Sequence, residues 1–224
     1  MKLGIVIPWR QQPSRIAAFH RTVEEISNDF PDASIYFSDT DSERFNLSAS
    51  RNRGCRFAIK DGCDIMLVLD ADTLLEKEAV ENSIRVAYEL DIVSLPYVVW
   101  NSLDTELSTS LLNKQLLVED VRRGNVGTLS RVHVGGAYVL TASTFLRLNG
   151  WDERFVGWGF EDNAFEAAHK VLLDRGFHRS AGHAITFDHE DRDQDNIEIN
   201  RQRFYEYTQK SKAEMLELVS GNNE

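Results

Sequence analysis

The sequence predicts an α/β fold, with a mostly parallel central sheet that carries helices on both faces. Short apolar runs, each long enough for one buried strand, alternate along the chain with amphipathic segments of helical periodicity. This alternation favours parallel strands joined by crossover helices, because each helix must pack its apolar stripe against the sheet. Charged residues follow several of the apolar runs, which is typical of strands that end at a ligand-binding edge. With 224 residues, the chain fits one domain over residues 1–224.

The first hundred residues contain the clearest strand and helix signals. Leu3–Ile7 is an apolar run that Pro8 stops, and Ile65–Leu69 is a run without any polar residue, so both are expected to be buried strands. Ser14 is expected to cap the helix that follows it, whose apolar residues recur near helical spacing. Further strands are expected at 35–37 and 92–96, and further helices at 48–59 and 76–90.

The rest of the chain divides into a polar stretch and a second ordered part. Residues 101–131 mix polar and charged residues with one leucine-rich stretch, so we expect a short amphipathic helix inside a mobile excursion. A lid, a substrate-contacting loop and an oligomer contact all remain open as its role. After it we expect a strand at 132–140, a helical turn at 142–148, a loop at 150–160, a helix at 162–175, a strand at 184–187 and one long polar helix at 196–219.

Composition narrows the class of protein. Hydrophobic residues make up 42% of the chain and charged residues 27%, which is ordinary for a globular protein. The formal net charge of −11 disfavours binding to nucleic acid through a basic face. No apolar run approaches the roughly 18–20 residues of a membrane span, and Cys55 and Cys63 are expected to be reduced, buried thiols. These features predict a cytoplasmic location.

Two carboxylates follow the apolar run at 65–69. Asp70 and Asp72 stand two residues apart at the predicted end of this strand, and Arg10 and Asp39 follow two other predicted strands. Because ligands bind at the carboxyl ends of parallel strands, we expect these side chains to converge on one edge. Oxygen ligands select hard cations, so the pair predicts a Mn²⁺ or Mg²⁺ site rather than a zinc site.

A second acidic cluster lies near the start of the helix expected at 162–175. Glu161 and Asp162 either stabilise the helix N-terminus or supply a general base that takes a proton from an attacking hydroxyl. Trp158 offers an aromatic face for a sugar ring. A histidine, either His183 or His189, is a candidate to complete the metal site, and spacing alone does not choose between them.

These motifs, taken in order, resemble those of GT-A fold glycosyltransferases, especially the β-1,4-galactosyltransferase and bacterial chondroitin-polymerase-like type. The specific part is the stretch Gly157-Trp158-Gly159-Phe160-Glu161-Asp162. The Asp70-Ala71-Asp72 motif is shared more widely. The other matching segments are Ile7-Pro8-Trp9-Arg10, Phe45-Asn46, Asn52-x-Gly54, Gly135-Gly136-Ala137 and the stretch from His189 to Phe204.

The resemblance implies a Rossmann-like GT-A domain and an inverting transferase that moves a sugar from a UDP-sugar to an acceptor hydroxyl, such as that of a glycan. It implies a nucleotide-sugar-binding half at 1–100 and an acceptor and catalytic half at 132–224. Asp162 would be the catalytic base with Glu161 beside it, and Asp70, Asp72 and His189 would hold Mn²⁺ or Mg²⁺. The residues expected to contact the donor are Pro8, Arg10, Asp39, Phe45, Asn46, Arg51, Asn52, Asp70, Gly136 and Trp158.

Two departures and two alternatives limit this prediction. Asn163 and Ala164 replace the further acids of the galactosyltransferases, so the acceptor identity does not transfer. The sequence shows neither a transmembrane stem nor a disulfide pattern like those of the Golgi enzymes, so we expect a bacterial or viral type of enzyme. A nucleotidyltransferase that makes a nucleotide sugar is the first alternative, although no glycine-rich loop follows the first strand. A non-catalytic sugar-binding module is the second. The donor sugar, the linkage and the oligomeric state stay open.

Overall fold

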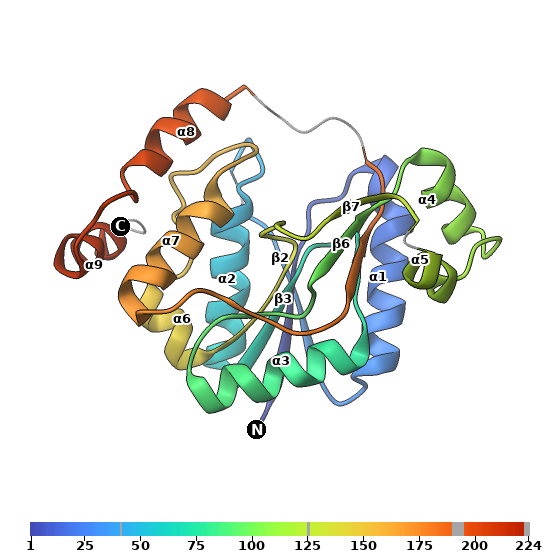
Figure 1. Cartoon of the computed structure of the whole chain (residues 1–224), viewed down its shortest axis with the longest axis horizontal. Coiled ribbons are helices and arrows are strands. Elements are labelled where there is room, and N and C mark those ends of the chain that lie inside the picture. Colours follow the sequence, from blue (N-terminus) through green and yellow to red (C-terminus); the bar gives the residue numbers. More distant parts are fainter. Residues whose placement is uncertain (41, 125, 190–194, 222–224) are drawn as a thin grey trace.

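The computed structural model of the protein describes residues 1–40, 42–124, 126–189 and 195–221 (Figure 1). The strands are β1 (Leu3–Pro8), β2 (Ser34–Ser38), β3 (Ile65–Leu69), β4 (Thr73–Leu74), β5 (Ser94–Leu95), β6 (Val99–Ser102), β7 (Thr128–Ser130), β8 (Ala137–Thr141), β9 (His178–Arg179) and β10 (His183–Thr186). The helices are α1 (Ile16–Asp29), α2 (Leu47–Lys60), α3 (Lys77–Leu90), α4 (Thr105–Leu112), α5 (Val118–Gly124), α6 (Ala142–Leu148), α7 (Glu161–Leu173), α8 (Ile197–Tyr205) and α9 (Lys212–Ser220).

The central sheet confirms the predicted α/β class. Among the described residues it has six strands in the order β2-β1-β3-β8-β5-β9. β1 pairs in parallel with β2 and with β3, so the chain leaves these three strands at the same edge. Figure 1 shows α2, α6 and α7 on one side of the central strands and α1 on the other, as expected for a sheet covered on both faces. Ile5, Val6 and Ile7 of β1 and all residues of β3 are almost completely buried because they lie in the middle of these layers.

β8 differs from the strand expected at 132–140. It begins only at Ala137, and it runs antiparallel to both of its neighbours, β3 and β5. Gly135 and Gly136 have φ of 127° and 72°, values that a regular strand excludes, so the strand starts after them. The sheet is therefore mixed, with an antiparallel strand inserted between parallel ones.

The segment 101–131 is more structured than the one short helix that we expected. Its helices α4 and α5 are separated by Lys114, whose φ of 58° breaks the helix, and the ends of the segment join a second sheet. Among the described residues this sheet has four strands in the order β4-β10-β6-β7. Through β10, it connects the segment to β4, which follows Asp72 in the chain.

Two helix predictions are corrected by the structure. The long helix expected at 196–219 is interrupted, because Gln209 has φ of 59° and Ser211 starts α9 with a capping box. Ser14 does not cap α1, since Pro13–Arg15 forms a 3₁₀ turn before the helix. Cys55 and Cys63 are buried and free, as predicted.

Candidate active site

Asp70 and Asp72 lie directly beyond the buried strand β3. The backbone N–H of Asp70 donates to the carbonyl of Gly136 at 2.8 Å, and Asp70 in turn accepts from the N–H of Thr73 at 3.2 Å. This tight turn places both carboxylates at the edge where β1 and β2 also end. The Asp70 side chain is 28% exposed and that of Asp72 is 10% exposed, so Asp70 is the more accessible of the two.

Arg51 joins the two acidic clusters. From α2, its Nη1 donates to Asp162 Oδ1 at 2.6 Å and its Nη2 donates to Asp70 Oδ1 at 2.9 Å. The side chain is completely buried, and its Cζ lies 5.4 Å from the ring centroids of both Tyr138 and Trp151. One buried guanidinium therefore fixes the spacing between the carboxylates at the end of β3 and the start of α7.

The charge of Arg51 is maintained by its partners. Burial alone lowers the pKa of the guanidinium, but the charges of Asp162 and Asp70 outweigh this effect and the pKa lies well above its ordinary value. Arg51 is also one of the side chains expected to contact the donor, and that contact stays a prediction. In the structure both of its terminal nitrogens donate to protein carboxylates.

Asp162 stands in the first turn of α7, where the helix dipole favours a negative charge. Gly135 allows its close approach, because a Cβ atom added at Gly135 would lie 2.3 Å from Asp162 Oδ2. The φ of 127° at Gly135 is also a conformation that other residues rarely adopt. The Asp162 side chain is 17% exposed, which leaves part of the carboxylate accessible from the site.

Glu161 has a different environment from its neighbour. It is 7% exposed, and its Oε2 accepts a hydrogen bond from the N–H of Gly159 at 3.1 Å. Burial, together with the charge of Asp162, raises the pKa of Glu161 to about 7. Glu161 thus supports the loop that carries Trp158, whereas Asp162 faces Arg51 and the site.

His189 lies beside Asp72. The distance from His189 Nε2 to Asp72 Oδ2 is 3.8 Å, and Arg15 approaches the same oxygen at 3.7 Å. Burial and the charge of Asp70 raise the pKa of Asp72, while Arg15 and His189 act in the opposite direction. His183 is turned elsewhere, since its Nδ1 is hydrogen-bonded to Asn101 Oδ1 at 2.9 Å.

Asp72 and His189 are close enough for both to bind one divalent cation. Two ligands that each lie about 2.1 Å from one cation are at most about 4.2 Å apart. The 3.8 Å separation of Asp72 and His189 meets this limit, and a carboxylate with an imidazole suits manganese. Within the ranges that the structure describes, no group of three or more His, Cys, Asp or Glu side chains comes together as a complete protein site.

The side chains expected near the nucleotide form two groups. Pro8 ends β1, and Arg10 beyond it forms a two-pronged ion pair with Asp39 through Nε at 2.8 Å and Nη2 at 2.9 Å. The Cζ of Arg10 lies 5.5 Å from the centre of the Phe45 ring. These residues therefore form one cluster at the ends of β1 and β2.

Asn46 and Asn52 instead attach α2 to the loop after α6. Asn46 caps α2 through the N–H of Ala49 and donates to the carbonyl of Glu153 at 2.7 Å. Asn52 is completely buried and bonds both the N–H and the carbonyl of Trp151. These hydrogen bonds hold α2 against the loop after α6, and so help to fix the position from which Arg51 extends.

Aromatic residues surround the glycines before β8. A Cβ atom on Gly136 would lie 2.1 Å from the ring of Trp100, which itself stacks on His133 with centroids 4.1 Å apart. Trp158 is 39% exposed, and Asn200 of α8 donates to the carbonyl of Val156 beside this loop at 3.1 Å. Trp100, His133 and Asn200 were missed by the sequence analysis, because no local pattern distinguishes them from core or surface residues.

Comparisons with known proteins agree with this architecture. No curated protein sequence matches the chain. Among solved structures, a mutant of Drosophila β1,4-galactosyltransferase 7 in complex with manganese, UDP-Gal and xylobiose is similar, with 16% identity, a TM-score of 0.52, and coverage of 89% of this chain and 79% of that chain. The catalytic domain of the Drosophila enzyme in complex with xylobiose has 17% identity and a TM-score of 0.45, with coverage of 80% of this chain and 64% of that one. The present chain thus spans just under two thirds of that structure's length.

Among the described residues, none of the helices has both the length and the apolar composition that crossing a membrane requires. The family profile described as glycosyltransferase-like family 2 matches residues 18–211, which is most of the chain. With its GT-A fold, the chain therefore belongs to the glycosyltransferase-like family 2.

Proposed function

We propose that the protein is a metal-dependent, inverting glycosyltransferase that moves a sugar from a UDP-sugar to an acceptor hydroxyl. The observation that carries the proposal is the pair of hydrogen bonds by which Arg51 holds Asp70 and Asp162 across the edge of the sheet. This pairing sets a donor-side carboxylate and an accessible candidate base at a defined separation. The structural likeness to a manganese and UDP-Gal complex of a Drosophila galactosyltransferase supports the choice of donor class.

The donor is assigned to the half of the chain within residues 1–100. We infer that the cluster of Arg10, Asp39 and Phe45 receives the uridine and that the diphosphate lies toward Asp70 and Asp72. Phe45 supplies an aromatic face and Asp39 a hydrogen-bond acceptor, which are the groups that a base and a ribose can use. Asp39 then exchanges part of its bonding to Arg10 for bonds to the ligand.

Asp72 and His189 are the side chains assigned to Mn²⁺ or Mg²⁺, with Asp70 assisting. When bound, such a cation supplies Lewis-acid stabilisation of the charge on a departing diphosphate. The oxygens of a diphosphate are of the chemical type that such a cation also accepts as ligands. Arg15, which approaches Asp72, adds a positive charge on the same side.

Asp162 is proposed as the general base. The acceptor oxygen forms a bond to the anomeric carbon while the bond from that carbon to the diphosphate oxygen breaks, and the hydroxyl proton passes to the Asp162 carboxylate. Attack from the face opposite the diphosphate inverts the configuration. Arg51 holds Asp162 through Oδ1, so Oδ2 is the oxygen available for the proton. Trp158, on the exposed loop beside α7, is proposed to contact a sugar ring.

The first experiment measures thermal unfolding with UDP, GDP, CDP and TDP, each with and without Mn²⁺. A ligand that binds only the native state raises the midpoint. We expect the largest increase with UDP plus Mn²⁺, followed by UDP release from a UDP-sugar in a panel of acceptors. Equal responses to all four nucleotides, or pyrophosphate release from a nucleoside triphosphate, would contradict the proposal.

A further inference from the structure

The two helices of residues 105–124 pack against the strand that leads to His189. Leu111, Val118 and Val121 of this α4–α5 segment form a hydrophobic cluster with Phe187, separate from the main core. Figure 1 places α4 and α5 beyond the second sheet, on the side of the molecule where α1 lies. The segment therefore has its own packed attachment to the end of β10.

Hydrogen bonds from α4 hold the residue just before His189. The N–H of Asp188 donates to Ser108 Oγ at 2.8 Å, and Thr105 Oγ1 donates to Asp188 Oδ2. Ser108 is buried and lies in the same turn of α4 as Thr105. These bonds fix both the main chain and the side chain of Asp188, and thereby the direction in which the chain enters His189.

A contact from α5 holds the other side of the proposed metal pair. Arg122 Nη2 donates to the carbonyl of Leu75 at 2.8 Å, three residues after Asp72. The main chain also joins the two sides directly, because the N–H of Phe187 donates to the carbonyl of Asp72 at 3.0 Å. The segment thus contacts both chain stretches that carry the candidate ligands.

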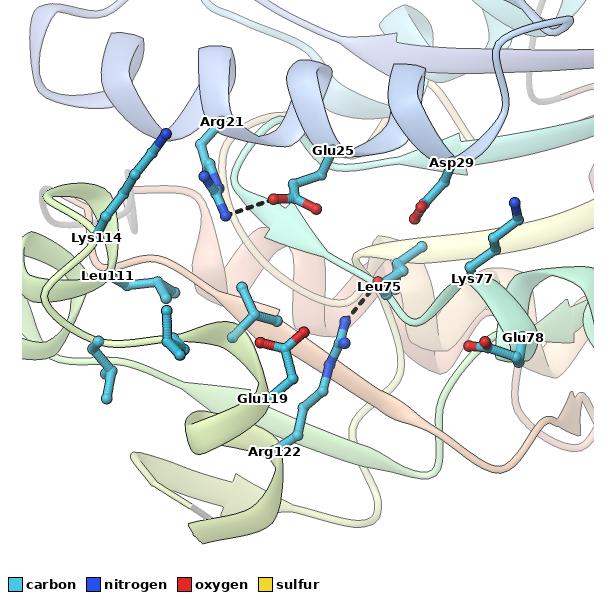
Figure 2. A pocket seen from close by; sticks show the side chains of 13 residues that line it. Arg21, Glu25, Asp29, Leu75, Lys77, Glu78, Leu111, Lys114, Glu119 and Arg122 are labelled. Carbon is cyan, nitrogen blue, oxygen red and sulfur yellow. Dashed lines mark hydrogen bonds and ion pairs between the residues drawn. The ribbon is translucent and has the colours of Figure 1, made fainter.

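The segment also borders a cavity, and Leu111 and Val118 of the hydrophobic cluster line part of it. This cavity of about 520 Å³ lies between α1, the start of α3 and the α4–α5 segment (Figure 2). Figure 2 shows Arg122 reaching across it to Leu75, with Arg21 and Glu25 of α1 on the far wall. Beside this cavity, the bonds to Asp188 and Leu75 act together with the hydrophobic cluster to hold the segment in place.

We propose that the α4–α5 segment is a clamp that positions Asp72 and His189 for a divalent cation. Thr105, Ser108 and Arg122 are its positioning residues, and none of them contacts the cation. Groups that orient metal ligands commonly change metal affinity by roughly 10–100-fold when they are removed. The inference rests on the proposed function, since it assumes that Asp72 and His189 hold a cation, and it assigns a role to a segment whose role the sequence left open.

The test compares Mn²⁺ affinity in the presence of UDP with UDP affinity in the absence of metal, both by calorimetry. The variants are Thr105→Val/Ser108→Ala and Arg122→Met, with Ser110→Ala and Arg123→Met as matched controls on the same helices. We expect the first two to bind Mn²⁺ roughly 10-fold more weakly, with metal-free UDP binding unchanged. Thr105→Ser keeps the hydroxyl and is expected to retain wild-type affinity.

The outcomes separate this inference from the proposed function. If the wild type binds Mn²⁺ and the clamp variants bind it equally well, the clamp is wrong and the metal site stands. If the wild type binds no Mn²⁺ with or without UDP, the metal site and the clamp are both wrong. If Thr105→Val/Ser108→Ala does not fold, the single variant Thr105→Val provides the comparison, because Thr105 is exposed on α4.

Discussion

Arg51 and Asp162 form an ion pair of 2.6 Å in which the arginine side chain has no exposed surface. Since Arg51 also holds Asp70, a single buried cation organises carboxylates from two separate parts of the chain. Removing one partner of a buried ion pair leaves the other charge buried without compensation. The resulting loss of stability is usually larger than the net stabilisation that the intact pair provides. The site is therefore expected to be sensitive to any change at position 51.

We expect Arg51→Met to lower the free energy of unfolding by about 3–5 kcal/mol, because two carboxylates lose a buried partner. Arg51→Lys keeps the charge but not the forked geometry, so its loss should be smaller. Unfolding in urea measures the stability loss of each variant. Arg56→Met, at an exposed position of the same helix, is the control and should cost less than about 1 kcal/mol. Similar losses for positions 51 and 56 would contradict the role of Arg51.

Asp162→Asn should lower sugar transfer at least about 100-fold, because the amide cannot accept the hydroxyl proton. UDP binding should stay near the wild-type value, since Asp162 is assigned to the acceptor side. Transfer rates and calorimetry with UDP measure the two effects. Asp174→Asn, an exposed residue just after the same helix, is the matched control. Retained transfer by Asp162→Asn would exclude this residue as the base.

Glu161 should make stability depend on pH. Its pKa in the folded protein is about 7 and its ordinary value is 4.5, so the folded state retains a proton that the unfolded state releases. Its stabilising contribution is present below about pH 4.5 and decreases as the pH rises to about 7. Glu161→Gln should remove this decrease, with a gain over wild type at pH 8 on the order of 3 kcal/mol. The free energy of unfolding of Glu161→Gln is measured at pH 5 and pH 8, with Glu166→Gln as the control. A gain in stability over the wild type that is the same at both pH values would contradict the expectation.

Gly135→Ala should displace Asp162. The added Cβ would lie 2.3 Å from Asp162 Oδ2, and the φ of 127° disfavours alanine. We expect the free energy of unfolding to fall by about 1–3 kcal/mol. We also expect the sugar-transfer rate of the folded protein to fall, because Asp162 is displaced. Gly176→Ala is the control, since no heavy atom lies within 4 Å of its added Cβ. Wild-type activity in Gly135→Ala would show that the position of Asp162 is not critical.

The two candidate histidines should respond differently to substitution. His189→Ala should reduce the Mn²⁺-dependent part of the thermal shift with UDP, because His189 lies 3.8 Å from Asp72. His183→Ala should preserve that part, since the His183 ring is bonded to Asn101. Thermal unfolding with UDP, with and without Mn²⁺, distinguishes the two variants. The reverse result would move the metal assignment to His183.

Local patterns were sufficient to predict the α/β class and the strands that lead to Asp39 and Asp70. β1 and β3 are recognisable because a strand buried on both faces needs an uninterrupted apolar run. The start of α7 at Glu161 was found to within one residue, since carboxylates collect at helix N-termini. In these places, the information lies within a few neighbouring residues of the chain.

The partners of the site residues depended instead on long-range packing. Arg51 and Asp162 are 111 residues apart in the chain, and nothing near either one indicates that they meet. The same is true of Ser108 and Asp188, and of the antiparallel insertion of β8 between parallel strands. Periodicity reports which face of an element is buried, but not which element covers it. The spacing of the carboxylates and the positioning of His189 therefore emerge only when the sheets, α2 and α4 have packed together.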